Sequence, residues 1–209
     1  MNRIRVKICG IANLDEARCA VELGADALGF NFWPQSPRFI APERAAGIIA
    51  ALPPLITYVG VFVDETLDRI GEIVSATGIN ADQLHGDESP EFCERIERVK
   101  LIKALRVTSD FDAARVADYP VSAILLDSSV RGMYGGTGER FDWRIAVEAK
   151  QYAPIILAGG ITIDNVKAAI AAVNPMAVDI CSGVEAEPGR KDLFKLKAFM
   201  AEVGEGIHR

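Results

Sequence analysis

The chain has 209 residues, half of them hydrophobic and a quarter charged, which is enough for one sizeable core and typical of a globular domain. Its formal net charge is −6 and it has no basic cluster suited to nucleic-acid phosphates, so no nucleic-acid partner is expected. The apolar stretch 48–63 is interrupted by Pro53 and Pro54, which argues against a membrane span. The N-terminal residues lack the apolar region of a secretory signal, which favours a cytoplasmic location.

The four cysteines, Cys9, Cys19, Cys93 and Cys181, lie far apart in the sequence. No Cys-x-x-Cys pair is present, so no metal site is expected, and a cytoplasmic setting argues against disulfides. Cys19 and Cys93 fall in helical patterns and are predicted to pack as small hydrophobic residues. Cys9 and Cys181 lie at the ends of predicted strands, so both a packing role and a chemical role remain open for them.

Eight short apolar runs rich in branched residues alternate with amphipathic segments along the chain. The runs begin at residues 5, 25, 56, 81, 100, 121, 154 and 176. The first amphipathic segment, 13–24, predicts a helix with Asn13 as its cap and Glu16 completing a capping box. Ser89, followed by a proline, predicts the start of another helix, and Thr162 is predicted to cap a third.

Strands that alternate with helices indicate parallel pairing, and nearly continuous apolar strands indicate a sheet buried on both faces. Eight such units predict an α/β fold, a (β/α)₈ TIM barrel, as a single domain over residues 1–209 with the last few residues frayed. The alternative is an open doubly wound sheet, which gathers its ligand groups at one switch point. Here polar residues follow the first, second, sixth, seventh and eighth strands, which favours the closed ring.

Glycines follow the last two predicted strands. Gly159 and Gly160 end the seventh run, and Gly183 follows the eighth. In barrels of this kind the loops after strands seven and eight commonly bind phosphate through backbone N–H groups, so a phosphate site is predicted here. The alternative is that these glycines only allow the chain to turn.

A third glycine-rich stretch follows the sixth predicted strand and contains Gly135, Gly136, Thr137 and Gly138. It lacks the Gly-Lys-Ser/Thr ending of a nucleotide P-loop. We expect either a mobile lid or a second wall of the phosphate site, with an ordinary solvated loop as the alternative.

Candidate chemical groups also lie at strand ends. Asp127 ends a strand that should be buried throughout, so its carboxylate belongs at the barrel mouth unless it only caps the next turn. Arg38, in the loop after the second strand, offers a planar fork for a carboxylate or phosphate, although exposed arginines are often only surface charges. Gln83 and His85 on the fourth strand either point into the mouth or are satisfied strand-end residues.

Several of these stretches together resemble one family. They are VKICGI, GFNFWPQSPRFI, VGVFV, QLHGDE, LLDS, GGTGERFDW, LAGGI and DICSGVEAEPGRKD, in this order along nearly the whole chain. The chain thereby resembles the phosphoribosylanthranilate isomerase family, barrel enzymes of tryptophan biosynthesis. The resemblance implies an isomerase that catalyses the Amadori rearrangement of N-(5-phosphoribosyl)anthranilate to 1-(2-carboxyphenylamino)-1-deoxyribulose 5-phosphate, without a metal or an organic cofactor.

The resemblance also implies residue roles. Cys9 matches the general base that removes the C2 proton, Asp127 matches the general acid that protonates the furanose ring oxygen, and Arg38 matches the residue that helps hold the anthranilate end. The phosphate site matches Gly160, Cys181, Ser182 and Gly183. The family usually has two serines before the last glycine, and Cys181 takes the place of the first, which is expected to alter phosphate affinity slightly.

Other functions give different expectations. The related histidine-pathway aminoaldose isomerase would use aspartates as acid and base, whereas position 9 is a cysteine. Indole-glycerol-phosphate synthase would have a lysine and glutamate pattern that is not found. A non-catalytic sugar-phosphate sensor would keep the glycine loops without needing both a thiol and a carboxylate. A phosphorylated aminosugar is therefore the expected partner, and monomer and homodimer both remain open.

Overall fold

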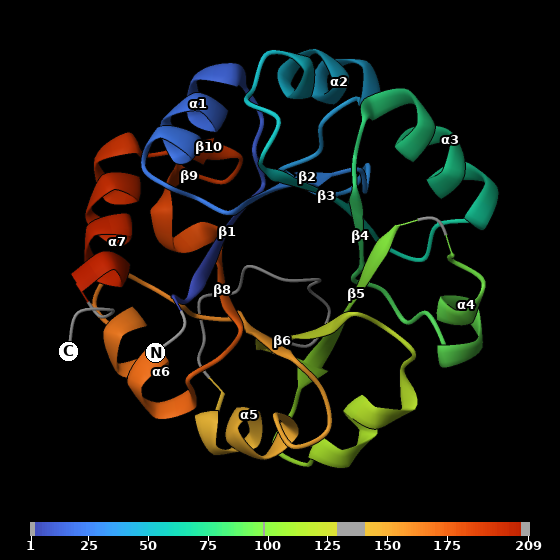
Figure 1. Ribbon diagram of the computed structural model, residues 1–209, viewed down its shortest axis with the longest axis vertical. Helices are drawn as coiled ribbons and strands as arrows, with labels where there is room; N and C mark the ends of the chain where they lie inside the picture. The colour runs from blue at the N-terminus through green and yellow to red at the C-terminus, as the bar shows by residue number, and fades with distance from the viewer. Residues whose placement is uncertain (1–2, 98, 129–140, 206–209) are drawn as a thin grey trace.

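The computed structural model describes residues 3–97, 99–128 and 141–205 of the chain. Eight parallel strands follow one another in sequence order and close into a barrel, and helices form a ring outside it (Figure 1). The strands are β1 Arg5–Cys9, β2 Ala27–Asn31, β3 Thr57–Phe62, β4 Ala81–Leu84, β5 Lys100–Val107, β6 Ala123–Ser128, β7 Ile155–Leu157 and β8 Ala177–Ile180. Each of the eight predicted runs contains one of them, so the closed (β/α)₈ barrel is confirmed and the open sheet is not the fold.

The connecting elements vary in length. The α-helices are α1 Leu14–Glu22, α2 Pro42–Ala50, α3 Leu67–Thr77, α4 Pro90–Glu94, α5 Trp143–Ala149, α6 Val166–Val173 and α7 Leu193–Glu205. Two 3₁₀ helices, η1 Ala113–Asp118 and η2 Ser182–Val184, and a short hairpin, β9 Glu185–Glu187 with β10 Arg190–Lys191, complete the described part. None of the described helices is both long and apolar enough to cross a membrane.

Two of the three predicted helix starts are confirmed. The Asn13 side chain accepts a hydrogen bond from Glu16 N at 2.9 Å and caps α1, and the Ser89 hydroxyl accepts one from Phe92 N at 3.3 Å and caps α4. The prediction for Thr162 is wrong, because α6 begins later, at Val166. The Asn165 side chain instead accepts from Thr162 N at 2.9 Å, which closes a separate turn before the helix.

The hydrophobic residues divide into two layers. The larger one lies between the barrel wall and the helices. The smaller one fills the barrel interior and consists of Val59, Ala81, Ile102, Ala104, Ala123, Leu125, Ile156, Ala158 and Ala177. Side chains thus fill the barrel, as is usual for this architecture, so a ligand has access only to its mouth.

β1 and β8 join the two ends of the sequence and close the ring. Lys7 pairs with Asp179, and Ile8 with Ile180, in the parallel register. The next residues, Cys9 and Cys181, therefore lie side by side at the carboxyl ends of these strands, because side chains at equal register point to the same face.

One carboxyl group is buried in the outer layer. Asp82 of β4 is 1% exposed and points away from the barrel interior, since its neighbours Ala81 and Gln83 face inward. Its Oδ1 atom has no hydrogen-bond partner among the described residues. Burial raises the pKa of Asp82 from 3.8 to about 7, so folding favours the protonated form.

Asp82→Asn should therefore stabilise the protein at neutral and alkaline pH. Between pH 3.8 and about 7 the folded state binds a proton that the unfolded state releases, so the stability of the native chain falls as pH rises. The gain from the variant should grow across this window and reach up to about 4 kcal/mol above it. The free energy of unfolding in urea, measured for both proteins near each end of the window, checks this.

Asp68→Asn is the matched control, because it removes one exposed negative charge from neighbouring α3. A difference between Asp82→Asn and the native chain that stays constant across the window would contradict the prediction.

Candidate active site

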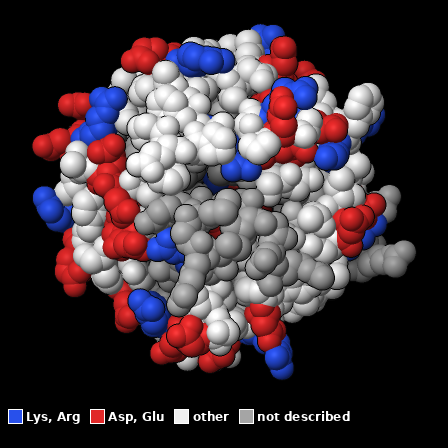
Figure 2. Space-filling view, turned by 180° about the vertical axis from the view of Figure 1, so that it is seen from behind, with Lys and Arg blue, Asp and Glu red and all other residues white. Residues whose placement is uncertain are grey.

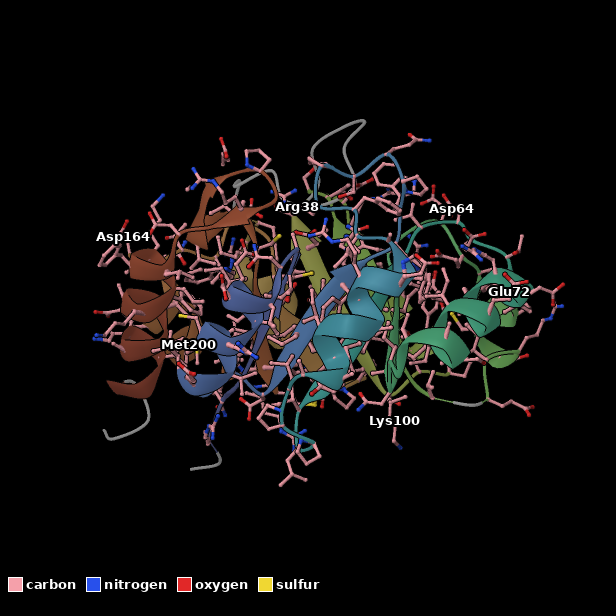
Figure 3. The ribbon with its side chains drawn as sticks, turned by 90° about the horizontal axis from the view of Figure 1, so that it is seen from above. Arg38, Asp64, Glu72, Lys100, Asp164 and Met200 are labelled. Carbon is pink, nitrogen blue, oxygen red and sulfur yellow. The ribbon has the colours of Figure 1, made fainter. Side chains whose placement is uncertain are left out.

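A cavity opens at the edge of the barrel where the strands end, and holds about 700 Å³ of space that is partly open to solvent. Arg38 and Asp64 lie at this edge and Lys100 at the opposite one (Figure 3). The lining residues are Cys9, Asn31, Trp33, Ser36, Arg38, Val61, Val63, Gln83, His85, Asp127, Ala158, Gly159, Gly160, Ile161, Asp179, Cys181 and Ser182.

The cavity thus brings together most of the site residues predicted from the sequence. Gly183 does not line it, because it belongs to η2 and packs against the carbonyl of Ile161. The predicted lid residues Gly135, Gly136, Thr137 and Gly138 lie outside the described residues. On this face of the molecule acidic and basic side chains lie around the periphery, and some basic atoms are visible near the middle of the face (Figure 2).

Two thiols, Cys9 and Cys181, lie next to each other at the carboxyl ends of β1 and β8. The hydrogen bond from Cys181 lowers the pKa of Cys9 well below its usual value; burial opposes this, and Lys7 and Lys191 support it. The hydrogen bond to Cys9, together with burial, raises the pKa of Cys181 well above its usual value. These opposite shifts favour deprotonation at Cys9 over deprotonation at Cys181.

A buried ion pair lies below these thiols, two residues earlier on β1 and on β8. Lys7 Nζ donates to Asp179 Oδ1 at 2.8 Å, and both side chains are less than a tenth exposed. Burial alone would lower the pKa of Lys7, but Asp179 and Cys9 raise it above its usual value, so the ammonium persists beneath the thiolate. Burial raises the pKa of Asp179 to about 6, against the opposing effect of Lys7.

Arg38 is presented by a loop with its own hydrogen bonds. Asn31 Oδ1 accepts from Trp33 N at 2.9 Å, and its amide donates to the Ser36 hydroxyl at 3.1 Å. The same hydroxyl accepts from Arg38 N at 3.1 Å. These bonds fix the loop between β2 and α2 and direct the arginine to the cavity.

Glu185 fixes the orientation of the Arg38 side chain. Its two carboxylate oxygens accept from Arg38 Nε at 2.9 Å and Nη2 at 2.7 Å. Lys191 Nζ donates to the same carboxylate at 3.0 Å, and to the Cys181 carbonyl at 3.2 Å. Burial alone would raise the pKa of Glu185, but Arg38 and Lys191 bring it below its usual value. Arg38 and Lys191 are positive and Glu185 is negative, so this cluster has a net positive charge beside the thiols.

The second chemical group of the cavity is the Asp127 carboxyl on β6. His85 Nε2 lies 3.2 Å from Asp127 Oδ2, although the ring N–H is not aligned for a regular hydrogen bond. The amide nitrogen of Gln83 lies 2.9 Å from His85 Nδ1. When this amide donates its hydrogen bond, Nδ1 is the acceptor, so the proton of the neutral imidazole is on Nε2, which faces Asp127. Gln83 Oε1 is buried and has no hydrogen-bond partner among the described residues.

The loop that carries His85 is held by a buried ion pair. Lys103 Nζ donates to Glu88 Oε2 and to the Gly86 carbonyl, both at 2.8 Å. The Glu88 carboxylate in turn accepts from Gly86 N at 3.0 Å. Both charged side chains are almost fully buried, so the imidazole next to Gly86 has a rigid support.

The turn after β7 can be made only by glycine. Gly159 and Gly160 have φ values of 67° and 66°, in the region that favours glycine. A Cβ atom at Gly159 would lie 2.2 Å from Ser128 N and 2.9 Å from Asp127 Oδ1. The backbone therefore passes close to the Asp127 carboxyl, and both glycines line the cavity next to Cys181 and Ser182 at the start of η2.

The sequence analysis missed four charged residues of the site: Lys7, Asp179, Glu185 and Lys191. Lys7 and Asp179 carried a usable signal, because each lies two positions before a cysteine on a strand, and Asp179 is the one charged residue of β8. Glu185 and Lys191 lie in the short β9–β10 hairpin, and the contact that brings Glu185 to the site joins it to Arg38, 147 positions away. The described residues include no group of three or more His, Cys, Asp or Glu side chains that could hold a metal ion.

The arrangement can remove a proton and donate one within one cavity. Asp179 interacts electrostatically with both Cys9 and Asp127, so a common neighbour links the thiolate and the carboxyl. The positive cluster around Arg38 and the glycine backbone offer two places for anionic groups. A small dianionic molecule with an exchangeable proton between its charged ends fits these features.

A protein-family model described as N-(5'-phosphoribosyl)anthranilate (PRA) isomerase matches residues 6–202. An N-(5'-phosphoribosyl)anthranilate isomerase of Geobacter metallireducens is 51% identical over 197 residues, which are 94% of this chain and 97% of the relative. A crystal structure of phosphoribosyl anthranilate isomerase in complex with reduced 1-(o-carboxyphenylamino)-1-deoxyribulose 5-phosphate has a TM-score of 0.87 and 43% identity, covering 97% of this chain and 99% of that one.

A structure described as mutually generated monomers of the dimeric phosphoribosylanthranilate isomerase from Thermotoga maritima also has a TM-score of 0.87. It is 41% identical, with 97% of this chain and 99% of that chain covered.

Proposed function

Because the chain belongs to the N-(5'-phosphoribosyl)anthranilate isomerase family, it is an isomerase of tryptophan biosynthesis, and we propose that Cys9 and Asp127 are its base and its acid. The observation that carries these roles is that one cavity holds a thiol with a lowered pKa and a carboxyl in contact with an imidazole.

Asp127 starts the rearrangement by protonating the furanose ring oxygen. The bond from C1 to that oxygen then breaks, and the anilino nitrogen forms a Schiff base with C1. His85 lies next to this group, with Nε2 3.2 Å from Asp127 Oδ2. Gln83 keeps the ring in place through the contact with Nδ1.

Cys9 completes the rearrangement by removing the proton on C2 as a thiolate. The electron pair of the broken C–H bond neutralises the protonated Schiff base and gives an enolamine, which becomes the aminoketose when C1 takes up a proton and the C2 hydroxyl releases one. Lys7 and Lys191 favour the thiolate before the proton moves.

The two charged ends of the substrate have separate places in this proposal. The backbone N–H groups at Gly159, Gly160, Cys181 and Ser182, which line the cavity, bind the phosphate, and Arg38 binds the anthranilate carboxylate. Gln83 Oε1, which has no partner among the described residues, accepts a hydrogen bond from a sugar hydroxyl. The Cys181 position contributes its backbone, so a thiol in place of a hydroxyl is compatible with phosphate binding.

Arg38→Met should raise KM at least as much as it lowers kcat. The variant loses a charge-assisted hydrogen bond to the substrate, which corresponds to roughly 10- to 100-fold in affinity. Glu185 keeps its contact with Lys191, so its charge is not left unpaired. Steady-state kinetics of this variant and of Arg38→Lys distinguish the contribution of the planar guanidinium group from that of the positive charge. Unchanged kinetics in both variants would contradict the carboxylate contact.

Cys181→Ala should move the acidic limb of the pH profile of kcat/KM to higher pH. The variant removes the hydrogen bond that lowers the pKa of Cys9, so the thiolate forms only at higher pH. Hydrogen bonds to charged groups contribute about 1.5 to 3 kcal/mol, which corresponds to about one to two pH units. Cys181→Ser keeps a donor at this position and should shift the limb less. If the acidic limb lies at the same pH in the native protein and in both variants, the hydrogen bond from Cys181 does not lower the pKa of Cys9.

One assay tests the function directly. Purified protein should convert N-(5-phosphoribosyl)anthranilate rapidly, as followed by the loss of substrate fluorescence or absorbance. The histidine-pathway aminoaldose, assayed in parallel, tests whether a second substrate is accepted. Binding of the anthranilate substrate without conversion would favour a sensor and overturn the catalytic roles.

We also propose that the protein acts in the cytoplasm. Its four cysteines are free thiols, and two of them line the cavity, which suits a reducing compartment. Monomer and homodimer both stay open for this chain.

A further inference from the structure

Cys9 and Cys181 form a pair of thiols where the barrel closes. The residues before them, Ile8 and Ile180, are register partners of β1 and β8. Neighbouring strands lie about 4.8 Å apart, within the range of about 4.4 to 6.8 Å that Cα atoms of a disulfide span. Both cysteines line the same cavity, which is partly open to solvent. The pair thus has the backbone spacing for a disulfide and access for a small reagent.

The surroundings give the two thiols different chemical roles. Lys191 Nζ lies 3.7 Å from Cys181 Sγ, and Lys7 is buried next to Cys9, so cations favour a thiolate at Cys9. Cys181 Sγ lies 3.7 Å from Glu185 Oε1, a carboxylate oxygen that can accept the thiol proton. A thiolate beside a protonated thiol is the arrangement in which the first sulfur is oxidised and the second resolves it.

We propose that Cys9 and Cys181 are an oxidation site for peroxides, in which the two sulfurs are joined reversibly as a disulfide. The Cys9 thiolate attacks one oxygen of hydrogen peroxide, the O–O bond breaks, and the released hydroxide takes up a proton to form water. Cys9 is then a sulfenic acid. The Cys181 sulfur attacks it, the S–S bond forms, the S–O bond breaks, and the departing hydroxide takes the Cys181 proton as a second water.

In total, two thiols lose two electrons and one peroxide is reduced. The disulfide protects Cys9 from further oxidation to the irreversible sulfinic acid, and a dithiol restores both thiols by exchange. While the disulfide lasts, no thiolate is available to act as the base. This consequence for activity rests on the proposed function, whereas the formation of the disulfide does not.

The test treats the reduced full-length protein with hydrogen peroxide and digests it under non-reducing conditions. Mass spectrometry should find a cross-linked peptide pair that contains Cys9 and Cys181 and has lost two hydrogen atoms. Isomerase activity should fall roughly 10²-fold or more, and dithiothreitol should restore it. The matched variant Cys181→Ser should form no such cross-link, and its Cys9 should proceed to sulfinic acid, with activity that dithiothreitol does not restore.

Sulfinic acid at Cys9 of the native chain without the cross-link would overturn the proposal, as would a Cys9 cross-link to Cys19 or Cys93. The cross-link without loss of activity would uphold the oxidation site and instead overturn the role of Cys9 as the base. Mass analysis needs no activity, so the two failures are distinguishable.

Discussion

Cys9→Ala should lower kcat roughly 10²- to 10⁴-fold, the usual contribution of a general base. The methyl group cannot take the C2 proton, and the positive surroundings that favour the thiolate cannot replace it. The overall fold should persist, because Cys9 lies at the end of β1 and its side chain lines the cavity. Steady-state kinetics, together with a thermal unfolding curve, separate lost chemistry from lost structure.

Cys19→Ala provides the matched control for this thiol. Cys19 is a free cysteine on α1 and does not line the cavity, so its loss should leave turnover near the native value. Turnover of Cys9→Ala within a few-fold of the native enzyme would end the assignment of the base.

Asp127→Asn should cause a second loss of the same size, roughly 10²- to 10⁴-fold in kcat, because opening of the sugar ring then lacks its acid. The amide has the shape of the carboxyl and can keep the contact with His85, so binding should change less than turnover. Measurements of kcat and KM over the pH range check this.

Asp118→Asn is a suitable comparison, since Asp118 is an exposed carboxylate at the end of η1. An Asp127→Asn enzyme that keeps native turnover would show that another group protonates the ring oxygen. His85, which lies 3.2 Å from Asp127, would then be the first group to test.

The barrel could be predicted from the sequence because its signals are local. Each strand is a short run of apolar residues, and Asn13 and Ser89 cap helices through bonds that span three residues. The wrong prediction at Thr162 shows where local signals fail. The start of α6 depends on the Asn165 side chain, which bonds back to Thr162 N and closes a turn before the helix. That amide also donates to the Gly160 carbonyl at 2.7 Å, so the glycine turn that precedes the helix decides the outcome.

The active site could be predicted only in part, for the same physical reason. A residue at the carboxyl end of a strand lies at the barrel mouth, so the positions of Cys9, Asp127 and His85 could be predicted from the sequence. Arg38 and Glu185 are 147 residues apart, and their contact depends on the closed ring and on the path of two loops. In the sequence Asp82 looks like an ordinary polar residue of a strand. Only the three-dimensional packing shows that its side chain is buried on the outer side of the barrel wall.

The ring is closed by a first and a last strand whose paired residues Lys7 and Asp179 lie 172 positions apart. During synthesis the residue at position 9 leaves the ribosome long before Cys181 and Lys191 exist. Until they arrive, this sulfur has neither the neighbouring proton donor nor the Lys191 ammonium and behaves as an ordinary thiol. The reactive sulfur is thus a property of the finished molecule, and a C-terminally truncated fragment keeps the residue without its reactivity.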